Sequence, residues 1–165
     1  MPPRSRTPAL HLAAALLTAS IAGCGASPQQ KAEAAKGVFT SSSDCAESGI
    51  LTIEQCMQAM SAAVVAHEKS APTYSELRRC EATEGANKCE HTHAGRFRPR
   101  LLAFLIVASE PPVATPLYAA PKGEAGFRAA DNKLYLEKDE TIRFSSHAQT
   151  LFEAHLKKDR SKRPL

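Results

Sequence analysis

The sequence lacks tryptophan and has few other aromatic residues, with three tyrosines and six phenylalanines in 165 residues. Aromatic side chains bury the largest areas, so apolar burial must come mainly from leucine, isoleucine, valine and alanine. A core of this kind buries less area per residue than an aromatic-rich one. We therefore expect a small domain that depends on covalent crosslinks for part of its stability.

The common sequence motifs of enzymes are also missing. There is no Gly-rich phosphate-binding loop, no GxSxG turn, no paired-carboxylate signature and no CxxC motif. Ser43 or Ser61 could be combined with His67 or His147 as a nucleophile and base, but no strained turn presents either serine. We predict that the protein is not an enzyme and uses no cofactor, and we interpret His67 as a core or boundary residue of a helix.

The net positive charge of the chain is too small to indicate a nucleic-acid partner. The formal net charge of the chain is +4, and Arg4 and Arg6 lie in an N-terminal leader. The distribution is more informative, since residues 44–90 are rich in acids and residues 91–165 in lysine and arginine. The basic C-terminal end could meet anionic lipid headgroups or an acidic partner, but it also fits a solvated tail.

No apolar run is long enough to span a bilayer, but the N-terminus carries the features of a secretory leader. A short basic head is followed by an apolar run over residues 9–21 and then by Ile21-Ala22-Gly23-Cys24. This ending resembles the bacterial lipobox, which implies cleavage before Cys24 and acylation of its thiol and amine, with chains such as palmitate. The alternatives are ordinary cleavage near Ala22 and an uncleaved anchor. By resemblance to the sorting rule of Gram-negative lipoproteins, Gly25 rather than aspartate after the cysteine implies an outer-membrane location facing the periplasm.

These features divide the chain into four parts. Residues 1–23 form the expected lipoprotein signal peptide, and residues 24–37 the lipidated cysteine and a small, polar tether. Residues 38–158 are expected to fold as one domain, and residues 159–165 form a basic tail. The protein is thus expected to contact a membrane through its lipid anchor.

Four cysteines remain in the expected domain, at positions 45, 56, 80 and 89. An even number in an exported chain predicts two disulfides, with free thiols or a metal site as weaker alternatives. An antiparallel pair of helices would bring Cys56 level with Cys89, which favours Cys56 with Cys89 and Cys45 with Cys80. The other two connectivities stay open.

Two helices are expected in the cysteine-containing half. Thr52-x-x-Gln55 matches a capping box, and apolar residues then recur at helical spacing until the chain reaches Pro72. Ser75 is expected to cap a second, shorter helix that ends at Gly85. Together these segments predict a helical hairpin held by disulfides.

The second half is expected to contain strands and a final helix. The apolar run at residues 101–108 predicts a central strand or a short buried helix. Four prolines interrupt the next stretch, so residues 117–118 can form only a short edge strand. Asp131-Asn132 is expected to be a two-residue hairpin turn, and residues 141–144 a third strand of a meander. The spacing of apolar residues over 148–157 predicts a short amphipathic helix.

The resulting prediction is an α+β fold. It consists of a disulfide-stapled helical hairpin, a small antiparallel sheet in the form of a hairpin or meander, and a short C-terminal helix.

The order of several motifs resembles the YgiB-like family of bacterial lipoproteins, whose function is unknown. The matching features are Ser43-Asp44-Cys45, Cys56 at the start of an Ala-rich helix, Ala71-Pro72-Thr73-Tyr74, Cys80, Gly85, Cys89, Pro116-Leu117-Tyr118, Phe127-Arg128 and Tyr135. Glu84 departs from the family pattern, which has an aromatic residue there, and a short basic end replaces a long Gly/Ser-rich tail. The resemblance implies a location and a folded unit rather than a reaction.

One segment is a candidate contact surface. Arg96, Arg98 and Arg100 would lie on one face of an extended strand and could hold an anionic envelope polymer or a partner protein, or simply protect an exposed sheet edge. His91 and His93 beside Cys89 are too few for a metal site, so none is predicted. We expect a non-enzymatic binding or structural module of the cell envelope. The alternative is a redox- or metal-handling lipoprotein that uses the Cys/His cluster.

Overall fold

The computed structural model describes residues 34–161. The elements, in chain order, are β1 Lys36–Phe39, α1 Ser42–Glu47, α2 Ile53–Ser70, α3 Leu77–Glu84, β2 Cys89–His91, β3 Phe97–Pro99, β4 Ala103–Val107, β5 Val113–Ala119, β6 Gly126–Arg128, β7 Leu134–Leu136, β8 Arg143–Phe144 and α4 Ser146–Ser161. The predicted signal peptide, Cys24 and most of the tether lie outside the described residues. None of the helices in residues 34–161 is long and apolar enough to cross a membrane.

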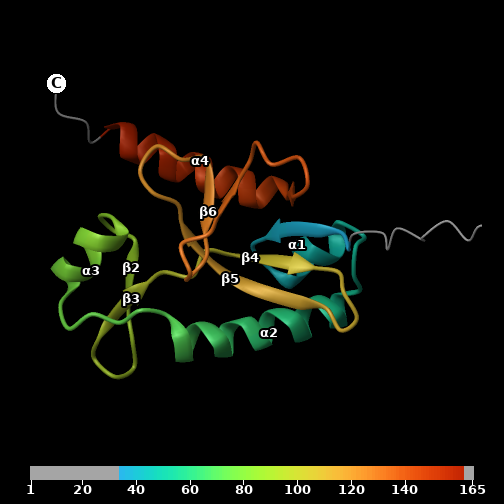
Figure 1. Cartoon of the computed structure of the whole chain (residues 1–165), viewed down its shortest axis with the longest axis horizontal. Helices are drawn as coiled ribbons and strands as arrows, with labels where there is room; N and C mark the ends of the chain where they lie inside the picture. The colour runs from blue at the N-terminus through green and yellow to red at the C-terminus, as the bar shows by residue number, and fades with distance from the viewer. Residues whose placement is uncertain (1–33, 162–165) are drawn as a thin grey trace, which may run out of the picture. The chain divides into compact units, whose positions relative to one another are not determined.

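Six strands form one sheet in the order β7-β6-β5-β4-β1-β8, with helices on both faces (Figure 1). Side chains alternate between the two faces of a strand. Phe104 and Ile106 of β4 therefore enter a core cluster with α1 and α2, whereas Ala103 and Leu105 enter a second cluster with α4. The sheet separates two apolar cores, each covered by its own helical layer.

The sheet is larger than the small hairpin or meander that the sequence predicts, and this part of the fold prediction is wrong. Strand β1 begins inside the expected tether, pairs antiparallel with β4 and pairs parallel with β8. The four residues of β1 are too few to show a local pattern. Its partner strands, β4 and β8, come much later in the chain. The strand is stabilised by Val38 and Phe39, which are fully buried on opposite faces of the sheet.

Strand β5 also differs from the prediction. The sequence predicts only a short edge strand at residues 117–118, but β5 has seven residues and lies between β4 and β6. Strand β6 pairs with β5 only at Tyr118 and Ala119, so Pro116 lies beyond the end of β6. Proline is tolerated there because one side of β5 has no strand to pair with at that point.

The predicted hairpin between β6 and β7 forms, but its loop is longer than two residues. The Ala129 N–H donates to the Lys133 carbonyl over 2.9 Å, and the Asn132 N–H donates to the Ala129 carbonyl over 3.1 Å. Asn132 has a φ of 68°, so a residue in the left-handed region closes a three-residue loop. The expected third strand of the meander does not join β7, because β8 pairs with β1 instead.

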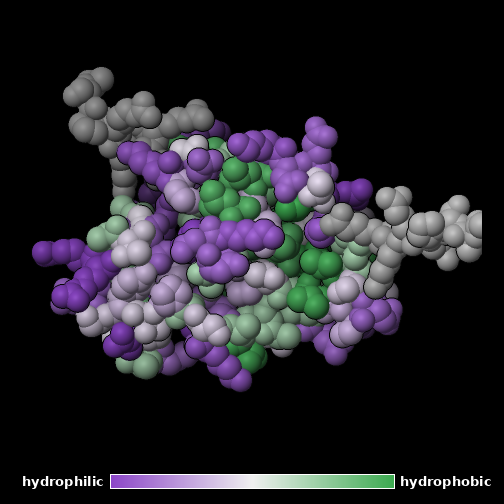
Figure 2. All heavy atoms as spheres, viewed as in Figure 1, coloured by the Kyte–Doolittle hydropathy of each residue, from purple (hydrophilic) through white to green (hydrophobic). Residues whose placement is uncertain are grey.

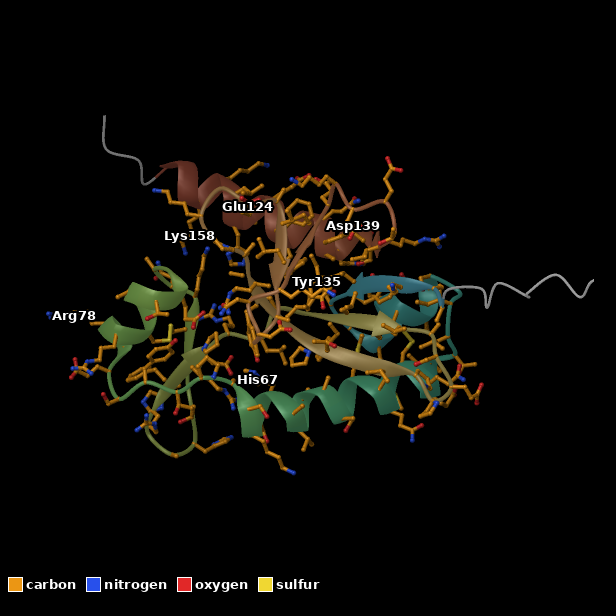
Figure 3. The ribbon with its side chains drawn as sticks, viewed as in Figure 1. His67, Arg78, Glu124, Tyr135, Asp139 and Lys158 are labelled. Carbon is orange, nitrogen blue, oxygen red and sulfur yellow. A yellow bond between two sulfur atoms is a disulfide. The ribbon has the colours of Figure 1, made fainter. Side chains whose placement is uncertain are left out.

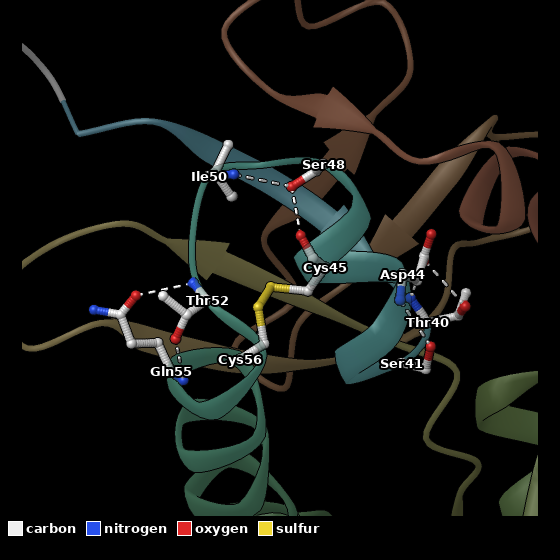
Figure 4. The surroundings of a disulfide bond; sticks show 9 residues. All are labelled: Thr40, Ser41, Asp44, Cys45, Ser48, Ile50, Thr52, Gln55 and Cys56. Carbon is white, nitrogen blue, oxygen red and sulfur yellow. Dashed lines mark hydrogen bonds between the residues drawn. A yellow bond between two sulfur atoms is a disulfide. The ribbon is translucent and has the colours of Figure 1, made fainter.

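Helix α2 has the capping box that the sequence predicts. The Gln55 N–H donates to the Thr52 hydroxyl over 3.3 Å, and the Thr52 N–H donates to the Gln55 side chain over 3.0 Å (Figure 4). Helix α3 ends at Gly85 as predicted, but its N-cap is Glu76 rather than Ser75 and makes no side-chain capping bond. The C-terminal helix α4 is confirmed and is longer than predicted.

All four domain cysteines form disulfides, but the favoured connectivity is wrong. The bonds join Cys45 to Cys56 and Cys80 to Cys89. The helical pair that a disulfide closes is therefore α1 with α2, rather than α2 with α3 (Figure 4). Helix α1 has only six residues, too few for a recognisable apolar period, so the sequence offered no helix to which Cys45 could be assigned.

A buried carboxylate beside this disulfide connects the two ends of the domain. Asp44 of α1 accepts hydrogen bonds from the Thr40 N–H over 2.8 Å and from the Ser145 hydroxyl over 2.7 Å, and His147 lies 3.2 Å from it. Burial raises the pKa of Asp44, but the hydrogen bonds from Ser145, Thr40 and His147 outweigh burial and leave this pKa below its ordinary value. The chain before α1 and the start of α4 are thereby held together.

Residues 73–100 form a distinct part of the domain, which we call the stapled lobe. It contains α3 and a separate two-stranded sheet of β2 and β3, and the Cys80–Cys89 disulfide joins α3 to β2. A short bridge pairs Tyr74 with Phe97. The stapled lobe lies at the C-terminal end of α2, beside the main sheet (Figure 1).

Candidate functional site

Ionisable side chains gather in the interior where the stapled lobe meets α2 and the main sheet. We call this group the polar junction, and it consists of His67, Tyr74, Glu84, Glu90, Arg98, Tyr118 and Arg128. Its members come from α2, α3, β2, β3, β5, β6 and the segment before α3. Figure 3 shows His67 at the end of α2 nearest the stapled lobe.

His67 occupies the centre of the polar junction. Its Nδ1 lies 3.0 Å from the Tyr118 hydroxyl, and its Nε2 lies 3.2 Å from a Glu90 carboxylate oxygen. Burial lowers the pKa of His67, partly offset by its hydrogen bond to Glu90, so the neutral ring is favoured. A carboxylate can only accept, so Nε2 carries the proton and Nδ1 accepts from Tyr118.

Glu90 connects this histidine to the opposite strand of the stapled lobe. Glu90 of β2 faces Arg98 of β3, and the Arg98 Nε donates to the same Glu90 oxygen over 2.8 Å. Arg98 is largely buried. One carboxylate oxygen therefore accepts from both a guanidinium and an imidazole, and it carries the negative charge that Arg98 needs in the interior.

A second ion pair also contacts Tyr118. The Arg128 guanidinium sits 5.7 Å from the centre of the Tyr118 ring and pairs with Glu84, whose side chain is only 4% exposed. The Tyr74 hydroxyl donates to the other Glu84 oxygen over 2.7 Å. Burial, followed by the contact with Glu84, raises the pKa of Tyr74. Glu84 thus connects α3 to β6 and to the start of the stapled lobe.

The geometry of the polar junction favours a structural role for these groups. In the described part of the chain, every buried side-chain nitrogen and oxygen has a hydrogen-bond partner. His67 is 2% exposed and both ring nitrogens are occupied, while burial raises the pKa of Tyr118. Neither group faces solvent as a free base or nucleophile. The junction fixes the stapled lobe against the main sheet.

The structure does not present the three predicted arginines as one free set. Arg98 is bonded to Glu90, whereas Arg96 donates to the Thr73 hydroxyl and carbonyl over 3.1 and 3.2 Å. Arg100 donates to the Cys89 carbonyl over 3.3 Å. Arg96 and Arg100 are exposed, and a guanidinium has five N–H donors, so both retain donors that face solvent.

The predicted Cys/His cluster contains no free thiolate, because its cysteine forms a disulfide. Cys89 is bonded to Cys80, and the His91 ring packs edge-on against Phe97 with 4.7 Å between the ring centres. No group of three or more histidine, cysteine, aspartate or glutamate side chains is placed to hold a metal ion within residues 34–161. Nothing in this geometry favours the redox or metal-handling alternative.

Comparison with known families assigns this folded unit. A family model described as a protein of unknown function (DUF1190) matches residues 33–162. The chain belongs to this family. Nothing among the curated proteins or the solved structures matches it.

The DUF1190 match covers every helix and strand described above, including the polar junction. The function of this family is unknown, so membership does not assign a reaction to the protein. The narrower YgiB-like resemblance stays a prediction, because the description of the matching family does not carry that name.

Sequence reasoning missed most of the polar junction in this DUF1190 protein. In the sequence, Glu84 is distinctive only as a departure from a family pattern, and Arg128 only as part of a motif. No motif of the sequence indicates that either side chain is buried. Their pairing could not be seen, because Glu84 and Arg128 are separated by 44 residues in the sequence.

Proposed function

We propose that this protein is a lipid-anchored protein of the bacterial envelope without enzymatic activity. In this proposal Cys24 holds it at the outer membrane facing the periplasm, and the stapled lobe binds an anionic envelope polymer. The leader that ends in Ile21-Ala22-Gly23-Cys24 supports the anchor. The two disulfides of the domain support an oxidising compartment.

The charge on the surface of the stapled lobe carries the binding part of the proposal. Among its exposed charged side chains, four are arginines and one is a glutamate: Arg78, Arg79, Arg96, Arg100 and Glu76. The remaining acids of the lobe are less exposed, and Glu84 and Glu90 are already paired with arginines. Figure 3 shows Arg78 pointing away from the body of the molecule.

A rigid support makes these arginines suitable for recognition. Long cationic side chains lose rotamer freedom on binding, and a fixed backbone limits the further loss. The Cys80–Cys89 bond and the polar junction hold the stapled lobe in place from two sides. Guanidinium groups also bind phosphate and carboxylate through paired hydrogen bonds, which suits an anionic polymer.

The test is binding of the purified natural protein to lipopolysaccharide, compared with uncharged dextran. We expect the double variant Arg96→Gln, Arg100→Gln to bind lipopolysaccharide about tenfold more weakly, because two exposed charges are lost. Binding by the natural protein should also weaken as salt is added.

The matched control removes two exposed lysines elsewhere, in the double variant Lys122→Gln, Lys138→Gln. This variant has the same net charge as the arginine variant, so nonspecific attraction predicts equal losses for both. Equal affinities of the two variants, or equal binding of lipopolysaccharide and dextran, would contradict the proposal.

A further inference from the structure

Strand β5 has an open edge on the side where β6 ends early. Strand β6 pairs with β5 only at Tyr118 and Ala119. Over residues 113–117, β5 is paired with β4 on one side, and no strand of the described chain pairs with it on the other. This opening continues the line that a longer β6 would follow.

The backbone groups at this edge can be assigned from one hydrogen bond. The Leu102 N–H donates to the Leu117 carbonyl over 2.9 Å, so Leu117 directs its backbone groups toward β4. Successive residues of a strand point these groups to opposite sides. Ala114 and Pro116 therefore direct theirs toward the open side, which presents one N–H and two carbonyls.

A hollow of about 320 Å³ lies beside this edge. Ala66 and Ser70 of α2 line it from one face of the sheet, whereas Tyr135 of β7 belongs to the core cluster on the other face. Thr115 and Pro116 line it from β5 itself. Because both faces contribute, the hollow lies in the plane of the sheet, at the place where another strand would add.

The lining indicates what kind of strand would fit. Alanine, proline and tyrosine side chains form most of the wall. On the face seen in Figure 2, hydrophobic and hydrophilic side chains alternate between α2 and α4. Pro116 has no N–H to donate, which limits pairing to a short segment and disfavours long edge-to-edge association. A short extended peptide with an aliphatic side chain meets both conditions.

We propose that this edge groove binds an extended peptide segment of a partner protein by strand addition to β5. The peptide exchanges backbone hydrogen bonds with Ala114 and donates one to the Pro116 carbonyl, so that its backbone occupies the hollow, while an aliphatic side chain packs against Ala66 on the α2 face of the sheet. This surface is separate from the arginines of the stapled lobe, so the inference does not depend on polymer binding.

The experiment probes an array of random-sequence peptides of strand length with the purified natural protein. We expect the bound peptides to share an aliphatic residue and to lack proline at their centre. Ala66→Lys should weaken binding of these peptides by about tenfold or more, because Ala66 is exposed on α2 and its replacement fills the groove without entering a core. Ser61→Lys, exposed on another side of α2, should leave binding unchanged.

Two further measurements separate strand addition from nonspecific adhesion. A bound peptide should slow hydrogen exchange of the Ala114 N–H, and methylation of the peptide nitrogen that faces β5 should abolish binding. The proposal is overturned if no peptide is bound, if Ala66→Lys and Ser61→Lys behave alike, or if exchange at Ala114 is unchanged. A dimer of this chain that Ala66→Lys disrupts would overturn it as well, because the edge would then belong to a second copy.

Discussion

Two buried side chains, His67 and Glu84, connect the stapled lobe to the rest of the molecule. His67 is bonded to Glu90 of β2 and Tyr118 of β5, and Glu84 is bonded to Arg128 of β6. Removing one member of a buried ion pair leaves its partner uncompensated and costs about 3–5 kcal/mol. At this scale the fold tolerates buried polar groups only because each one has a partner.

His67 makes the stability of the domain depend on pH. Its pKa in the folded protein lies below the ordinary value of 6.5, so the unfolded chain takes up this proton first as the solution is acidified. We expect its contribution to be complete above the ordinary pKa and to be lost progressively as the pH falls toward the lowered pKa of the folded state. His67→Gln should unfold more easily by about 1–3 kcal/mol near neutral pH and should vary less with pH.

Urea unfolding at about pH 7.5 and about pH 5.5 measures both effects. The control is His93→Gln, which removes an exposed histidine of the stapled lobe and should retain the original pH dependence. An unchanged pH dependence in His67→Gln would show that this histidine does not couple folding to protonation.

Each disulfide joins a helix to the element that follows it. Cys45–Cys56 closes α1 onto α2 within a fully buried part of the core, and Cys80–Cys89 closes α3 onto β2. In the chain-entropy model, a disulfide that closes a loop of about this length stabilises the fold by about 3 kcal/mol. Small domains have a total stability of roughly 5–15 kcal/mol, so either bond is a large fraction of it.

Replacing the cysteines in pairs should separate the two roles. We expect Cys45→Ala, Cys56→Ala to lower the unfolding midpoint of the whole domain, because this pair lies among core side chains of the main sheet. Cys80→Ala, Cys89→Ala should chiefly speed hydrogen exchange within the stapled lobe. Thermal melts and exchange measurements test this, and reduction of the natural protein should lower the midpoint. An unchanged midpoint after verified reduction would contradict the stabilising role.

Elements with strong local signals were predictable, and those defined by distant partners were not. The capping box at Thr52 and the period of α2 lie within one stretch of sequence, so that helix was predicted correctly. The apolar run at residues 101–108 predicts a central strand or a short buried helix, and the structure has the central strand, β4. Strand β1 is too short for a pattern of its own, and β8 has only two residues, so neither could be assigned to the sheet.

For the whole molecule we propose an anchored domain, and the anchor depends on the N-terminal segment. A cleaved leader and acyl chains on Cys24 would hold residues 34–161 near a membrane without any membrane-spanning helix in the domain itself. The proposed contact surfaces belong to the domain, whereas the location belongs to the leader. The two parts can therefore be tested separately.

Processing of the leader has a measurable consequence. We expect the natural protein to begin at Cys24 and to carry acyl chains there, which intact-mass analysis of envelope membranes would show. Cys24→Ser should remove the acyl chains and release the protein from the membrane fraction. Recovery of unacylated protein from the cytosol, with its four domain cysteines reduced, would contradict export.

Features that depend on neighbouring residues or on composition could be predicted from the amino-acid sequence. These are the α+β class, helix α2 with its cap, a buried apolar element where β4 lies and the presence of two disulfides. Tertiary structure alone decided the six-stranded sheet, the disulfide pairing and the polar junction. The sheet and the polar junction depend on contacts between segments far apart in the chain, where burial free energy selects the partner and no local pattern indicates it. The disulfide pairing depends on helix α1, which is too short for a recognisable apolar period.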